Sequence, residues 1–377
     1  MQALTTHSIT STTDLERACG GWSQEPILGL DTEFVRTRTF YARLGLVQIA
    51  SSSGVYLLDA VAVEDLSPLG LALQAPSTER VLHSCSEDLG IFLQCFGRLP
   101  KTIFDTQVAA SLVGLGFSLS YQSLVERELG VRLEKEETRS DWTRRPLSPA
   151  QLEYAAKDVS YLLALHGLLS ERLRNLGREA WAIEEFARLL EPARYEVDPA
   201  EAWRRVKGAG SLDRVGLATL KALCEWREEE AKRRDLARPF VVRDQALLAV
   251  ARRRPQRYDQ LRQISELRGS DRGRHGRALL DRVAAVSRGS GDSQPPRAPT
   301  APRVRGLSEL VKGLQGVVAD LGQDLSIAPE VLAQRRLLLR LAQDYLGHGS
   351  RELPKELQGW RREVVGLPCL AYLDAHA

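Results

Sequence analysis

The sequence predicts an α/β domain with a mixed sheet, followed by a basic region built only of helices. Segments rich in β-forming residues come first, and they then alternate with segments of helical periodicity up to about residue 195. Beyond Pro199 only helical periodicity recurs. The charge changes sign at the same place: residues 1–197 hold 19 Lys and Arg against 26 Asp and Glu, whereas residues 198–288 hold 22 against 13. A basic region behind an acidic domain is typical of a polyanion-binding module attached to a separate working part.

The composition indicates a folded chain of several domains. The 377 residues are 43% hydrophobic and 27% charged, which predicts two or three domains with sizeable cores. No run of about 18 apolar residues occurs, and the first residues lack the layout of a secretion signal. The five cysteines are scattered without a Cys-x-x-Cys pair, which argues against a disulfide framework and a zinc site. We therefore expect a cytoplasmic protein without membrane contact and without an evident obligate protein partner.

The elements of the first domain follow from local patterns. Runs of β-forming residues predict strands over 27–34, 44–50, 55–59, 80–83 and 102–105, the first three as an antiparallel meander. Helical spacing of apolar residues predicts helices over 86–96 and 106–115. Asp105 precedes the second of these helices and is expected to cap it.

Two further helix starts are signalled by Ser followed by Pro. Ser67 is expected to cap a short helix that begins at Pro68. Ser148, with Pro149 next and Gln151 three residues after the cap, predicts a long helix that continues past Leu169.

The rest of the chain divides by composition. Residues 289–303 are rich in Gly, Ser and Pro and have little to bury, so they predict a linker. We expect a first domain over 1–195, a basic helical domain over 198–288, a linker over 289–304 and a further helical domain over 305–377.

The first strand delivers two carboxylates at its end. Strand side chains alternate between faces, so Asp31 and Glu33 project from the same face. At about 4 Å and an effective dielectric constant near 20, two like charges repel by roughly 4 kcal/mol. One carboxyl group therefore holds a proton or a cation lies between them, unless both splay into solvent at the strand end. Mg²⁺ is a suitable occupant, because hard cations take oxygen ligands.

Three other residues could join this pair. Asp88 stands at the start of a predicted helix, and Tyr154 and Asp158 are four residues apart on one helix face. Four carboxylates around one point remain ionised only with cations among them, and two metals about 3.5–4 Å apart would also bind a phosphate. A phenol with a pKa of about 10 suits positioning a water more than removing its proton. Structural roles stay open: a helix-start acid for Asp88, a solvated acid for Asp158 and a half-buried core aromatic for Tyr154.

Three motifs, in this order, resemble those of bacterial ribonuclease D, in the tyrosine-bearing subclass of the DEDD exonucleases. They run from Leu30 to Tyr41, from His83 to Leu89 and from Glu153 to Val159, and the stretch from Arg139 to Trp142 resembles the same family. The basic helical region is similar to an HRDC domain in Ala202-Trp203, in Trp226-Arg227 and in the stretch from Asp235 to Val242. Residues 305–377 resemble, more weakly, a second HRDC-like bundle.

The resemblance implies a ribonuclease H-like exonuclease fold and 3′→5′ removal of single nucleotides as 5′-monophosphates. It implies RNA as partner, with tRNA precursors and single-stranded 3′ ends as substrates. By motif, the ligands of two divalent cations, Mg²⁺ or Mn²⁺, would be Asp31, Glu33, Asp88 and Asp158, and Tyr154 would hold the attacking water. Phe34 is a candidate for packing against the terminal sugar or base, and a core role for it is equally open.

Two other functions fit the same residues. A DNA 3′→5′ exonuclease of the proofreading kind would share the fold and the ligands, because nothing in these residues identifies the sugar. A non-catalytic nucleic-acid-binding protein with an inactive nuclease fold is the second alternative, although such a protein has no reason to keep five matched groups.

Overall fold

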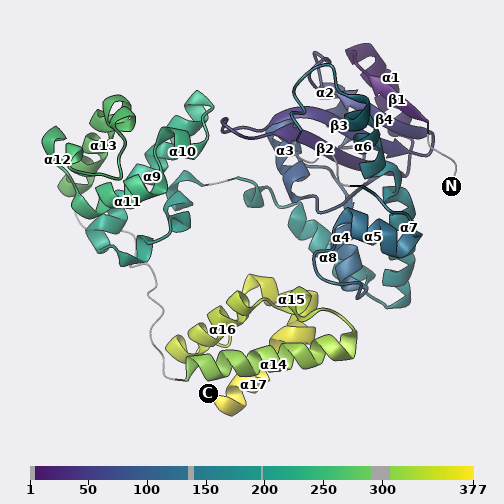
Figure 1. The fold of residues 1–377 in the computed structure, drawn as a ribbon. Coiled ribbons are helices and arrows are strands. Elements are labelled where there is room, and N and C mark those ends of the chain that lie inside the picture. The colour runs from purple at the N-terminus through teal and green to yellow at the C-terminus, as the bar shows by residue number, and fades with distance from the viewer. Residues whose placement is uncertain (1–4, 135–139, 197, 290–305) are drawn as a thin grey trace. The chain divides into compact units, whose positions relative to one another are not determined.

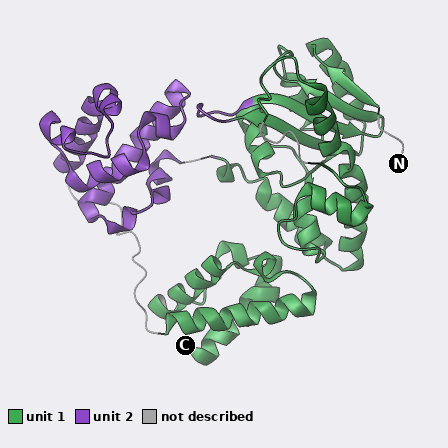
Figure 2. Cartoon of the chain, in the orientation of Figure 1, with its two compact units in different colours: residues 1–35, 44–195, 303–377 green, residues 36–43, 196–302 purple. Residues whose placement is uncertain are grey.

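The computed structural model describes residues 5–134, 140–196, 198–289 and 306–377, which divide into two compact units. Unit 1 comprises residues 1–35, 44–195 and 303–377, and unit 2 comprises residues 36–43 and 196–302 (Figure 2). Each unit has its own hydrophobic core. Of the predicted linker over 289–304, only Gly289 lies within the described residues. No helix among the described residues is both long enough and apolar enough to cross a membrane.

A six-stranded mixed sheet forms the centre of unit 1 (Figure 1). Its strands are β1 (Thr6–Ile9), β2 (Ile27–Val35), β3 (Arg43–Ser51), β4 (Gly54–Asp59), β5 (Glu79–Leu82) and β6 (Ile103–Asp105). The order across the sheet is β1-β4-β3-β2-β5-β6. β3 and β4 pair antiparallel, whereas β1 with β4, β2 with β5 and β5 with β6 pair parallel, which confirms the predicted mixed sheet. β2 is thus an interior strand.

Among the described residues of unit 1, eight helices precede residue 190. They are α1 (Thr12–Trp22), α2 (Ser67–Ala72), α3 (Ser86–Phe96), α4 (Thr106–Leu112), α5 (Tyr121–Leu129), α6 (Pro149–Ser160), α7 (Leu162–Asn175) and α8 (Glu179–Leu189). The Asp105 carboxylate caps α4 by accepting from the backbone N–H groups of Gln107 and Val108, as predicted. The capping box of Ser148 and Gln151 is also present. The prediction for Ser67 was wrong: Leu66 is the N-cap of α2, because the Ser67 hydroxyl donates instead to Asp65 Oδ2 at 2.8 Å.

The long helix expected from Pro149 past Leu169 is divided at Tyr161 into α6 and α7. The Tyr121 hydroxyl lies between two backbone groups that an unbroken helix would pair. It donates to the Lys157 carbonyl at 3.3 Å and accepts from the Tyr161 N–H at 3.1 Å. A side chain inserted into the backbone hydrogen-bond ladder is a recognised cause of helix breaks.

Apart from the segment 36–43, the described residues of unit 2 form helices and the short connections between them, as the hydrophobic pattern predicted. Its helices are η2 (Pro199–Arg205), η3 (Ala209–Ser211), α9 (Arg214–Arg234), α10 (Arg238–Val241), α11 (Asp244–Arg253), α12 (Tyr258–Arg262) and α13 (Gly269–Arg288). Trp203 and Trp226 are buried in its core, on η2 and α9. The segment 36–43, which joins β2 to β3, folds as part of this unit.

The C-terminal helices belong to the core of unit 1. They are α14 (Leu307–Leu325), α15 (Pro329–Leu332), α16 (Arg335–His348), η5 (Lys355–Leu357), η6 (Arg362–Gly366) and α17 (Leu367–His376). The ring of Trp360 stacks on that of Trp181 in α8, with centroids 4.4 Å apart and planes 11° apart. Its indole N–H donates to Glu185 Oε1 at 2.9 Å. At Gly114, where φ is +84°, a Cβ atom would stand 2.2 Å from the Ser326 carbonyl oxygen, so a side chain there would clash.

We expect Trp360→Ala to lower the free energy of unfolding of unit 1 by about 3 kcal/mol, because it removes a buried indole and its stacking contact with Trp181. Urea unfolding of the full chain measures this loss. Phe117→Ala is the matched control, since 47% of that side chain is exposed, and it should change stability by less than about 0.5 kcal/mol. An unchanged midpoint for Trp360→Ala would show that the C-terminal helices do not stabilise the unit.

Candidate active site

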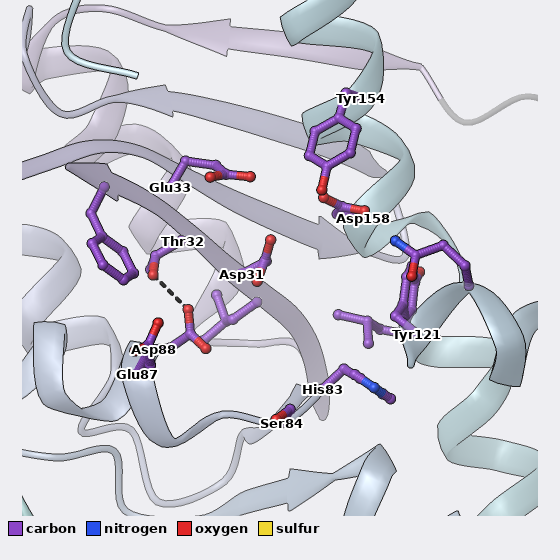
Figure 3. Close-up of a pocket in the computed structure, with 14 residues that line it drawn as sticks. Asp31, Thr32, Glu33, His83, Ser84, Glu87, Asp88, Tyr121, Tyr154 and Asp158 are labelled. Carbon is purple, nitrogen blue, oxygen red and sulfur yellow. Dashed lines mark hydrogen bonds between the residues drawn. The ribbon is translucent and has the colours of Figure 1, made fainter. Parts of the chain in front are cut away.

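Strand β2 and helices α3 and α6 bring the predicted site residues to one pocket of about 560 Å³ (Figure 3). The pocket is lined by all six residues singled out from the sequence, namely Asp31, Glu33, Phe34, Asp88, Tyr154 and Asp158. β2 carries the first three, α3 presents Asp88 in its first turn, and α6 presents the remaining two from one face. Residues from three distant parts of the chain therefore meet.

Three of the four acids form a tight cluster that could hold a metal ion. One carboxylate oxygen each from Asp31, Glu33 and Asp158 can be chosen so that all lie within 4.8 Å of one another. Burial, reinforced by the charges of Asp158 and Asp88, raises the pKa of Glu33 to about 8 from its ordinary 4.5. Burial, followed by the charges of the three other acids, raises the pKa of Asp31 well above 3.8. Closely spaced oxygen ligands that resist ionisation together are the donor set that a divalent cation satisfies.

Asp88 lies in the same pocket but outside this cluster of three. It is 7% exposed, and its Oδ1 accepts a hydrogen bond of 2.5 Å from the Thr32 hydroxyl (Figure 3). Burial raises the pKa of Asp88 to about 7, and the hydrogen bond from Thr32 opposes that rise. Asp88 contributes the largest electrostatic effect on Asp31, after burial. One oxygen of Asp88 is therefore oriented by Thr32 while its charge acts on the cluster.

Tyr154 faces Asp158 across one turn of α6 (Figure 3). The centroid of its ring lies 6.1 Å from that of Trp142, whose side chain is 1% exposed. Burial, then the charges of Asp158 and Glu33, raises the pKa of the Tyr154 hydroxyl far above its ordinary value of 10. Burial raises the pKa of Asp158 to about 7, against the effect of its hydrogen bond with Tyr154. The phenol therefore stays protonated at neutral pH and acts as a hydrogen-bonding group.

Several pocket residues were not among the six predicted for the site. They are Leu30, Thr32, His83, Ser84, Glu87, Tyr121, Gln122 and Leu162. The ring of His83 bonds the Thr106 hydroxyl at 2.9 Å and the Leu119 carbonyl at 3.0 Å, so both its nitrogens are occupied. Burial lowers the pKa of His83, so its ring is neutral at pH 7. The one available signal for Thr32 was its position beside Asp31 in the first motif, and Tyr121 carried none.

The raised pKa of Glu33 predicts how the metal-free protein responds to pH. Between about pH 4.5 and 8 the unfolded chain has released this proton whereas the folded protein keeps it, so the folded state binds more protons. Stability should therefore fall as pH rises through this window. Thermal unfolding in EDTA at pH 6 and pH 8 should show the fall, and Glu33→Gln should lessen it.

A divalent cation should reverse this trend, because it binds the deprotonated carboxylates and stabilises the folded state. We expect Mg²⁺ or Mn²⁺ to raise the Tm more at pH 8 than at pH 6. Asp141→Asn is the matched control for Glu33→Gln, because Asp141 is an exposed acid whose pKa is lowered by its hydrogen bonds with Thr143. This variant should show the same metal-induced rise in Tm as the wild type. A metal-induced shift that is equal at both pH values would contradict the cluster as the binding site.

Comparison with known proteins finds two family models that match separate parts of the chain. Residues 6–174 match the family model described as 3'-5' exonuclease, and residues 216–283 match the HRDC domain. Ribonuclease D of Pseudomonas paraeruginosa is 38% identical over 361 residues, covering 96% of each chain. Ribonuclease D of Escherichia coli is 37% identical over 359 residues, covering 95% of each.

Solved structures of similar proteins share the fold of this chain. The crystal structure of Escherichia coli RNase D, described as an exoribonuclease involved in structured RNA processing, superposes with a TM-score of 0.91 at 36% identity, covering 99% of this chain and all of that one. The catalytic core of RRP6 from Trypanosoma brucei shares the fold, with a TM-score of 0.58 at 20% identity over 75% of this chain and 80% of that one. With this identity sustained over nearly the whole length, the chain belongs to the ribonuclease D family of 3′→5′ exonucleases.

Proposed function

We propose that this protein removes nucleotides one at a time from the 3′ end of RNA, releases 5′-mononucleotides and acts on tRNA precursors in the cytoplasm. The observation that carries the proposal is the cluster of Asp31, Glu33 and Asp158, with Asp88 and Tyr154 in the same pocket. All five cysteines are free thiols, which suits a reducing compartment. The domain division over 1–195, 198–288, 289–304 and 305–377, with the last as a second HRDC-like bundle, is part of the same proposal.

The acids are suited to hold two divalent cations, Mg²⁺ or Mn²⁺, with Asp31, Glu33, Asp88 and Asp158 as the ligands. Bound there, the cations would supply Lewis-acid stabilisation of the attacking and leaving oxygens of an in-line displacement. The hydrogen bond from Thr32 to Asp88 Oδ1 would orient the Asp88 carboxylate within this set.

The other residues position the reactants. Tyr154 keeps its proton, so it orients the attacking water by hydrogen bonding and does not remove the water's proton. Phe34, half-buried at the pocket wall, offers a ring on which the terminal sugar or base can pack. Without cations the acidic pocket repels the phosphate backbone, so binding energy has to come from elsewhere on the chain.

A 3′-extended tRNA, incubated with Mg²⁺ or Mn²⁺, tests the proposal when product size and end chemistry are both read. Stepwise shortening from the 3′ end with release of 5′-mononucleotides is the expected result. Faster degradation of single-stranded DNA than of RNA would instead assign a DNA exonuclease. No hydrolysis of either by the folded, metal-loaded protein would leave a non-catalytic nucleic-acid-binding protein.

A further inference from the structure

The segment 36–43 leaves the strand that carries Asp31 and Glu33 and folds into the basic helical unit. Two hydrogen bonds fix it there: the Ala237 N–H donates to the Arg38 carbonyl, and the Tyr41 N–H donates to Asp235 Oδ1, both at 2.9 Å. Asp235 ends α9 in the left-handed conformation, with φ of 47°. The turn between α9 and α10 therefore holds the segment from both sides.

Phe40 anchors the segment by its side chain. It is half-buried and packs against the hydrophobic core of unit 2. The guanidinium carbon of Arg238 lies 4.8 Å from the Phe40 ring centroid, and the Lys232 ammonium nitrogen lies 6.0 Å from it. The Tyr41 ring meets that of Phe40 edge-on, with centroids 5.0 Å apart. The Tyr41 ring and two cations thus surround the Phe40 ring.

The outer part of this contact is open to solvent. Tyr41 is 42% exposed and Phe240 is 45% exposed, and the Arg38 guanidinium carbon lies 5.6 Å from the Phe240 ring centroid. Arg38 and Lys232 are exposed, and no ion pair joins either of them to a carboxylate within the described part of the chain.

The nearby acids do not neutralise these two cations. The Glu228 carboxylate is 1% exposed and pairs with Arg238 at 2.5 Å. Asp235 accepts a hydrogen bond from the Tyr41 N–H and keeps its charge, but no ion pair in the described part of the chain joins it to Arg38 or Lys232. Glu230 pairs with Arg233 and Arg234. The surface therefore keeps two unpaired positive charges beside two exposed rings.

We propose that Arg38, Tyr41, Lys232 and Phe240 form a binding surface for single-stranded RNA, which we call the composite surface. Such binding combines cations that contact phosphates with aromatic faces on which bases stack, and this surface presents both. The inference rests on the proposed function, because the ligand of this surface would be the same RNA molecule whose 3′ end enters the pocket. Tyr41 follows Glu33 by eight residues, so chain connectivity alone keeps them within about 30 Å. A single-stranded RNA of moderate length can therefore contact both the composite surface and the pocket.

Binding and turnover of RNA by the full chain test the composite surface. Fluorescence anisotropy in EDTA gives the Kd for a labelled 12-nucleotide RNA without hydrolysis, and steady-state kinetics with Mn²⁺ gives KM. We expect Tyr41→Ala/Phe240→Ala to raise both by about tenfold, because two stacking platforms are lost. Arg38→Gln/Lys232→Gln should reduce the slope of log Kd against log salt concentration by about 1.4, or 0.7 for each lost phosphate contact.

Two variants elsewhere in unit 2 serve as matched controls. Tyr258→Ala removes a ring that is 48% exposed, and Arg277→Gln removes a charge whose side chain is 90% exposed. Both should leave Kd within about twofold. Unchanged Kd in folded composite-surface variants, or equal losses in the controls, would overturn the inference. The anisotropy result does not depend on hydrolysis, so an inactive wild-type protein would overturn the proposed function and still leave the composite surface tested.

Discussion

Replacing Asp158 by Asn should reduce release of mononucleotides by about 10²- to 10³-fold, the scale on which active sites lose rate when one electrostatic stabiliser is removed. Asp158 is one of three acids whose oxygens approach within 4.8 Å, and it is also the partner of Tyr154. An amide neither carries the ligand charge nor accepts the tyrosine hydrogen bond in the same way. Single-turnover hydrolysis of a 3′-labelled RNA with saturating Mn²⁺ measures the loss directly.

The fold should survive this substitution, because it removes one of several mutually repelling carboxyl groups. The Tm of metal-free Asp158→Asn should therefore be equal to or above that of the wild type at pH 8. Glu153→Gln on the same helix is the matched control, since Glu153 is exposed and pairs with Lys157 at 2.6 Å. Its activity should stay within about twofold of the wild type. If folded Asp158→Asn hydrolysed RNA at the wild-type rate, Asp158 would have no role in the reaction.

The parts of the site that could be predicted from the sequence are those that depend on local sequence patterns. Strand alternation places Asp31 and Glu33 on one face, and the Ser148 capping box fixes where α6 begins, hence which face carries Tyr154 and Asp158. Both signals depend on residues no more than a few positions apart. That these elements converge on one pocket followed from the resemblance of three ordered motifs and not from periodicity.

What could not be predicted depends on contacts between residues distant in sequence. The break at Tyr161 requires the hydroxyl of Tyr121, 40 residues away, and nothing in the helical pattern signals it. β1 was missed because it has only four residues, three of them polar and exposed, and its strand conformation depends on the pairing with β4. The docking of segment 36–43 depends on Asp235, 194 residues from its partner Tyr41.

Because the C-terminal helices pack on unit 1, the basic unit cannot be removed simply by truncating the chain. Trp360 and its neighbours pack on α8, so truncation after residue 197 would also expose Trp181 and part of the core of unit 1. Excision of residues 198–302, bridged by a flexible Gly/Ser linker of about 30 residues, avoids this damage. The variant should also carry Phe40→Ser, because Phe40 packs against the removed core.

This excision should raise KM for a 3′-extended tRNA by about a hundredfold and flatten its salt dependence, because residues 198–288 hold 22 basic against 13 acidic residues. Hydrolysis of a saturating dinucleotide should keep its kcat within a few-fold, since all six residues proposed for the pocket remain. The slope of log KM against log salt concentration separates the two effects, because lost phosphate contacts lower it whereas damage to the pocket lowers kcat at every salt concentration. An unchanged KM and slope would place RNA affinity in unit 1, and the charge asymmetry of the chain would then have no role in substrate binding.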